Sequence, residues 1–221
     1  MALWTVNFFP LWNYFDKTFF ACDNRFMPHT RYTELVTLAE DHAGLFTSEQ
    51  ARQVGFTDSV LTRLTQRGRL ERTARGVYRV PYIPLNRFSQ YMEVVLWAKA
   101  HRGPMNVALS HETALVAYGI SDANPAAIHL TVPGAARLRR VAPKALVLHR
   151  ANLAPDEITI VEGLPLTTIA RTVIDLLASG GRVDLVRQTI ADARREGFIS
   201  IAEARRLRGR LQNYLQALRA S

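Results

Sequence analysis

The sequence is poor in cysteine and lysine, and it lacks any long apolar run. Its 221 residues include one cysteine, Cys22, and three lysines, which leaves 25 arginines among the 28 basic residues. A single cysteine excludes a disulfide framework or a cysteine-based zinc site within the chain, as suits a reducing cytoplasm. Because no apolar segment approaches the length that spans a bilayer, we expect a cytoplasmic protein with no membrane partner.

Motifs of familiar catalytic chemistry are also missing. The chain has neither a G-x-S-x-G nucleophile turn nor a glycine-rich phosphate loop. His111-Glu112 opens like a metalloprotease helix, but Leu115 stands where the second histidine ligand is required. His129 and His149 lie in alternating segments and could meet in space, yet hydrogen-bonded sheet histidines are commoner than two-histidine metal sites. We therefore predict no catalytic residue, no metal and no cofactor.

The positive charge is concentrated in three blocks. The net charge is +9 and the isoelectric point is near 10.3, which favours an anionic partner such as nucleic acid. Residues 63–79, 137–150 and 182–221 each carry a net charge of +5, and the remainder sums to −6. Three basic blocks on an otherwise acidic chain indicate separate basic surfaces.

Residues 45–80 have the pattern of two short helices separated by a tight turn. Thr47 and Gln50 have the capping-box spacing that begins a helix, and Gly55 ends it. Thr57 then caps a second helix over residues 58–67, which Gly68 stops. This order of caps and glycines predicts a helix-turn-helix.

The second of these helices has an apolar face and a polar face. Val60, Leu61 and Leu64 fall on the side that packs inward. The opposite side offers donors and acceptors suited to base edges in a major groove, and we predict four base-reading residues: Ser59, Thr62, Arg63 and Gln66. We predict phosphate contacts from Thr47, Ser48, Arg67, Arg69, Arg72 and Arg75.

A basic hairpin follows the second helix. Residues 70–72 and 77–80 are predicted strands, and Gly76 lies in the turn where a positive φ is expected. With an amphipathic helix at 32–43, this predicts a winged helix-turn-helix domain over residues 27–84. The alternative interpretation of the hairpin is an ordinary solvated charge run.

Residues 85–221 are predicted to form a small mixed α/β domain that ends in two helices, which makes the fold class α+β. Helices are expected at 89–100, 111–118, 168–177 and 183–196, and after Ser200. Short strands are expected at 128–132, 146–150, 158–161 and 164–166. Arg171 and Asp175 have the i, i+4 spacing of an intrahelical ion pair.

Residues 1–26 differ from the rest of the chain. They hold nine of the 20 aromatic residues and show no regular alternation. They fit neither a signal peptide nor a basic membrane-surface helix. We interpret them as a doubtful leader, translated from upstream of a start at Met27.

Residues 32–197 resemble the AbiEi antitoxins of type IV toxin–antitoxin (abortive-infection) systems. The resemblance rests on RGVYRVP at 75–81, SHETAL with a following YG within 110–119, IHLTVP at 128–133 and GLPLTTIARTVIDLL at 163–177. It implies a winged helix that represses its own operon and a second domain that counteracts a nucleotidyltransferase-like toxin without binding it tightly. It also implies no cofactor. The E-x-K strand of the endonuclease domains that often follow such modules is absent.

We therefore predict a regulator that binds double-stranded DNA at its own operator, the antitoxin-like component of a type IV system, and not an enzyme. Two alternatives remain open. The chain could be a stand-alone winged-helix regulator or a protein-binding adaptor without a cognate toxin. It could also be an enzyme whose C-terminal site carries no known motif, in which case a deep polar pocket beside the 168–177 helix is expected.

Overall fold

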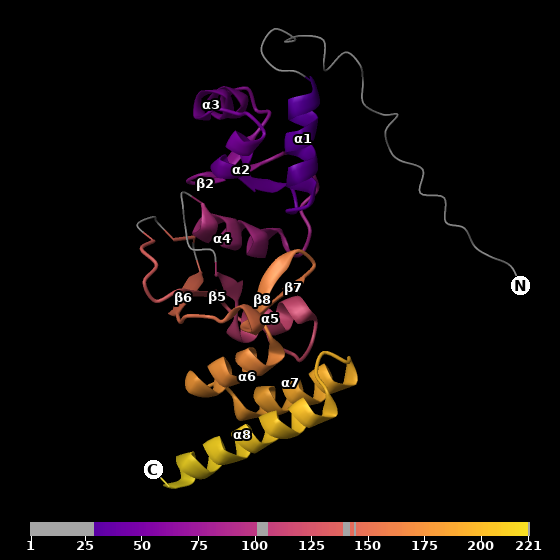
Figure 1. Cartoon of the computed structure of the whole chain (residues 1–221), viewed down its shortest axis with the longest axis vertical. Coiled ribbons are helices and arrows are strands. Elements are labelled where there is room, and N and C mark those ends of the chain that lie inside the picture. The colour runs from indigo at the N-terminus through magenta and orange to yellow at the C-terminus, as the bar shows by residue number, and fades with distance from the viewer. Residues whose placement is uncertain (1–28, 101–105, 139–141, 144, 221) are drawn as a thin grey trace, which may run out of the picture.

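Figure 1 shows the protein as a stack of three layers along its longest axis. The computed structural model describes residues 29–100, 106–138, 142–143 and 145–220. Helices α1–α3 and a small sheet lie at one end, helix α4 and a second sheet lie in the middle, and helices α6–α8 lie at the other end. The predicted leader, 1–26, falls outside the described residues.

The first layer is a winged helix-turn-helix. It comprises α1 (His29–Glu40), α2 (Ser48–Gln53) and α3 (Asp58–Gln66) with strands β1 (Leu45–Thr47), β2 (Glu71–Ala74) and β3 (Val77–Arg79). The strands form an antiparallel sheet in the order β1-β3-β2. The predicted helices and hairpin are confirmed, whereas β1 was not predicted. The apolar stripes of the helices close a core around Leu35, Phe46 and Leu61, each of which is fully buried.

The middle layer is a five-stranded mixed sheet with α4 (Ser89–Lys99) against one face. Its strands are β4 (Ala108–Leu109), β5 (Ile128–Val132), β6 (Leu146–Arg150), β7 (Ile158–Val161) and β8 (Leu164–Thr167). The order is β6-β5-β4-β8-β7, with β4/β8 and β5/β6 parallel and the other pairs antiparallel. Helix α4 also packs against β1, β2 and β3, so the apolar core around α4 includes residues of both sheets.

The third layer consists of α6 (Ile169–Ala178), α7 (Val183–Arg195) and α8 (Ile201–Ala220), on which α5 (His111–Tyr118) also packs. The α+β fold class is thereby confirmed. The apolar positions that predicted these helices are the buried ones, among them Val173, Val186, Ile190 and Leu207. None of the described helices combines the length and apolar character that crossing a membrane requires.

Because side chains alternate along a strand, one face of the larger sheet is apolar and the other carries polar side chains. Leu130 and Val132 belong to the apolar core shared with α4. The intervening residues face α5, because the His129 ring stacks on that of His111 and the Thr131 hydroxyl donates to Ser110. Polar side chains from β5 and β6 are therefore gathered under the start of α5.

Candidate nucleic-acid interface

The turn between α2 and α3 is fixed by caps that the local sequence predicts. Thr47 accepts a hydrogen bond from the Gln50 backbone N–H at 3.2 Å, and the Gln50 side chain accepts from the Thr47 N–H at 2.8 Å. Thr57 accepts from the backbone N–H of Val60 at 3.4 Å and so begins α3. Both caps satisfy donors that a helix start leaves without partners, so the starts of the two helices are set locally.

The polar face of α3 points away from the core. Leu61 and Leu64 are buried on the inner side. The outer side is exposed along its length, and it carries the four predicted base-reading residues: Ser59, Thr62, Arg63 and Gln66. Figure 1 shows α3 at the extreme end of the molecule, where no other element covers it. The outer face of α3 is therefore polar and exposed.

The hairpin beside α3 presents most of its arginines to the outside. Arg67, Arg72 and Arg75 are exposed and Arg69 is half-buried. The turn is completed by Gly76, whose φ of +81° disfavours residues with a Cβ. Arg79 is different, because it donates to Glu71 at 2.7 Å and to the carbonyl oxygens of Pro81 and Ile83 at 3.2 Å. Arg79 thus anchors the hairpin to the chain that leaves it.

Two of the residues predicted to hold phosphate are used inside the fold. Thr47 is 5% exposed and Ser48 is 2% exposed. The Thr47 hydroxyl serves the α2 cap, and the Ser48 backbone N–H donates to the carbonyl oxygen of Gly76 at 3.0 Å. Their side chains offer little surface to a phosphate, so arginines are the accessible cations of this face.

Residues 34–81 match the family model described as "Transcriptional regulator, AbiEi antitoxin". Over these residues the chain is similar to the AbiEi antitoxin family. The match runs from within α1 to the end of the hairpin, so the exposed polar helix and its arginines lie in the segment that matches this regulator family. The resemblance drawn from the sequence motifs is confirmed for this part of the chain.

Comparisons of the whole chain add less. The RV2827C protein from Mycobacterium tuberculosis has a similar crystal structure, with a TM-score of 0.46 and 17% sequence identity over 82% of this chain and 71% of that one. The search of curated proteins found no match.

Outside the AbiEi segment, the larger sheet holds a second polar site that the motifs did not predict as a unit. His129 and His149 do meet, with their Nδ1 and Nε2 atoms 2.9 Å apart. His111, set aside because Leu115 is not a histidine, joins them from the start of α5, and its ring stacks on that of His149 with 3.6 Å between centroids. Local spacing could not reveal this cluster because its members come from three separate elements.

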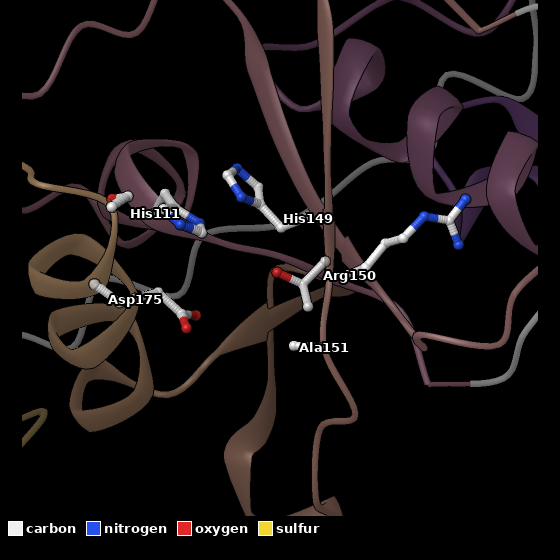
Figure 2. A pocket seen from close by; sticks show the side chains of 8 residues that line it. His111, His149, Arg150, Ala151 and Asp175 are labelled. Carbon is white, nitrogen blue, oxygen red and sulfur yellow. The ribbon is translucent and has the colours of Figure 1, made fainter.

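A pocket of about 250 Å³ opens beside these rings, and Figure 2 shows it between the sheet and α6. Its other walls include Arg150, Asp175 and Ser179. The pocket has polar walls but is widely open to solvent, whereas the enzyme alternative predicts a deep pocket.

Proposed function

We propose that this protein binds double-stranded DNA at its own operator and represses transcription, as the antitoxin component of a type IV toxin–antitoxin system. Helix α3 enters the major groove, where Ser59, Thr62, Arg63 and Gln66 contact base edges. Arg67, Arg69, Arg72 and Arg75 contact the flanking phosphates. The observation that carries the proposal is the exposed polar face of α3 beside an arginine-rich hairpin, within a segment of the AbiEi regulator family.

Charge and shape support this proposal over a solvated surface without a partner. The arginines of residues 63–79 outnumber the one acid by six to one, and that acid, Glu71, is paired with Arg79. The remaining arginines flank an exposed helix, and a helix that binds in the major groove has to be exposed. Phosphate contacts of this kind dominate affinity, and base contacts add specificity.

Arg63 is the residue best placed to read a base. Replacing it with alanine should weaken binding to the protein's own promoter fragment by about 1–3 kcal/mol while changing binding to unrelated DNA much less, if it pairs with guanine. Fluorescence anisotropy with both duplexes measures this difference. The matched control is Arg208→Ala, which removes the same charge from α8 at the opposite end of the molecule and should leave both affinities unchanged.

Arg75, at the tip of the hairpin, should act differently. Arg75→Ala is expected to weaken promoter and unrelated duplexes alike and to reduce the slope of log affinity against log salt by about one, because one phosphate contact is lost. Anisotropy titrations at several salt concentrations give the slope. Equal behaviour of Arg63→Ala, Arg75→Ala and Arg208→Ala would show that DNA does not lie on this face.

The toxin half of the proposal concerns residues beyond the AbiEi segment. We propose that the second part of the chain counteracts a nucleotidyltransferase-like toxin encoded beside it, without a tight complex and without catalysis of its own. Co-expression should then restore growth while a pull-down of either protein recovers little of the other. A stable complex would favour the adaptor interpretation, and failure to restore growth would favour a stand-alone regulator.

A further inference from the structure

Three histidines from three different elements converge on the α5 side of the larger sheet. His129 lies on β5, His149 lies on β6, and His111 is the first residue of α5. Each histidine has one ring nitrogen that lies within 4.8 Å of a ring nitrogen of both other histidines. The chain has only six histidines, so the meeting of three at one point, 18 and 20 residues apart, calls for a physical explanation.

The separation between His129 and His149 suits a shared ion, and the His111 ring, which stacks on that of His149, has to rotate to turn its lone pair to the same point. Two imidazole nitrogens bound to one tetrahedral Zn²⁺ at 2.0–2.1 Å lie about 3.3 Å apart, and His129 Nδ1 and His149 Nε2 are 2.9 Å apart. Without metal, one of these rings donates a hydrogen bond to the other. With metal, that proton occupies the other nitrogen of its own ring, and both facing nitrogens offer lone pairs.

His111 has a strained backbone conformation, and a neighbouring hydroxyl orients its ring. Its φ is +53°, in the left-handed region that non-glycine residues seldom adopt. Ser110 sits at the N-cap of α5 but makes no cap hydrogen bond. Its hydroxyl instead contacts His111 Nδ1 at 3.0 Å and accepts from Thr131 at 2.8 Å. An oriented Nδ1 leaves Nε2 as the ligand atom, and such supporting hydrogen bonds accompany most metal-bound histidines.

We propose that His111, His129 and His149 bind one divalent transition-metal ion of the Zn²⁺ class, with its remaining coordination position open to the adjoining pocket. Three histidines with an open position form a recurrent zinc arrangement, and imidazole is a ligand that Zn²⁺ favours. This proposal is independent of DNA binding, because His129 and His149 lie on the larger sheet and His111 lies on α5, all outside the winged helix.

The pocket holds an independent sign of a missing partner. Asp175 is 9% exposed and lines the same pocket as His111 and His149, and its buried Oδ2 has no hydrogen-bond partner among the described residues. Figure 2 shows its carboxylate extending from α6 toward the strand that carries His149. A water bound to the metal would give Oδ2 the donor it lacks, since buried carboxylate oxygens rarely remain without one.

The protonation of the cluster agrees with metal binding. Burial, with help from the neighbouring His149 and His129 rings, lowers the pKa of His111 to about 3. Burial also lowers the pKa of His129 and of His149. Burial thus favours the neutral form of each ring, which is the form that binds metal.

The test is metal binding by the full chain, with any affinity tag removed and metal stripped with EDTA. Zn²⁺ affinity is measured by competition with a chromophoric chelator, and Co²⁺ reports coordination through its visible absorption. We expect one Zn²⁺ per chain. His149→Phe keeps the ring stacked on His111 but removes the ligand, and should weaken Zn²⁺ binding by at least about 100-fold; Ser110→Ala should weaken it about 10-fold to 100-fold.

His42→Gln is the matched control. His42 is half-buried and its Nδ1 bonds the carbonyl oxygen of Leu38 at 2.8 Å, far from the cluster in the sequence and in the winged helix. This variant should bind Zn²⁺ as the wild type does. Wild-type binding that His149→Phe leaves intact, or no Zn²⁺ uptake by the wild type, would overturn the proposal.

If His149→Phe fails to fold, two measurements on the wild type test the proposal. Zn²⁺ must then shift the histidine-ring NMR signals of His111, His129 and His149 and leave that of His42 in place. The thermal midpoint of the wild type must also rise with Zn²⁺, because a ligand that binds only the folded state stabilises it. Unshifted ring signals would contradict the site.

Discussion

Replacing Arg171 with methionine should lower the free energy of unfolding by about 3–5 kcal/mol, because it leaves a buried carboxylate without its partner. Arg171 Nε donates to Asp175 Oδ1 at 2.8 Å, and its Nη1 lies 3.1 Å from Glu157 Oε2. The Arg171 and Asp175 side chains are 16% and 10% exposed, so water replaces the lost contacts poorly. Urea denaturation in EDTA measures the change without a contribution from metal binding.

The matched control is Arg182→Met. Arg182 pairs with Asp184 at 2.6 Å, but both side chains are more than 60% exposed, at 63% and 68%. Solvent screens such a pair, so its loss should leave the free energy of unfolding unchanged within error. Adding Asp175→Asn to Arg171→Met should recover part of the lost stability, since the stranded charge is removed. Equal effects of Arg171→Met and Arg182→Met would contradict this account.

The Arg171 variant should also acquire a pH dependence. Burial raises the pKa of Asp175 above its ordinary value even with Arg171 beside it, and loss of the guanidinium should raise it further. A raised folded-state pKa means that stability is lost as pH rises through it and is retained near the unfolded value of about 3.9. The deficit of Arg171→Met should therefore be smaller at about pH 5 than at about pH 7.5.

Features that depend on neighbouring residues could be predicted from the sequence. The predicted bounds 111–118, 128–132, 146–150 and 158–161 are those of α5, β5, β6 and β7, because helix caps and strand alternation act within a few residues. The capping box of α2 and the Arg171–Asp175 pair are likewise local. The AbiEi family match covers the part of the chain where such local signals are densest.

Features that depend on residues far apart in the sequence could not be predicted from it. Strand β1 has three residues and no alternation to reveal it, and it exists because β3 pairs with it. Glu157 completes the Arg171 ion pairs from 14 residues away, a contact that no local spacing indicates. The histidine cluster depends on β5 and β6 being parallel neighbours and on α5 starting above them, a register that no single motif contains.

Replacing Trp97 with alanine should lower the free energy of unfolding by about 3–5 kcal/mol, the cost of emptying a large buried aromatic site. Trp97 is 1% exposed and is the largest fully buried side chain of the described residues. It lies on α4, whose core includes Leu45 and Val77 from the small sheet as well as Leu109 and Leu164 from the large one. Calorimetry or urea denaturation measures the loss.

The Trp97→Ala variant also tests whether the predicted boundary after residue 84 separates two independently folding units. Because α4 packs against β1 and β3 as well as β4, β5 and β8, the cavity should loosen both sheets together. Hydrogen exchange should then show reduced protection at Phe46 and Tyr78 as well as at Leu130. Trp97→Phe, which keeps an aromatic ring at this position, should show a smaller loss at all three. Unchanged protection at Phe46 and Tyr78 would mean instead that the AbiEi module holds its fold without α4.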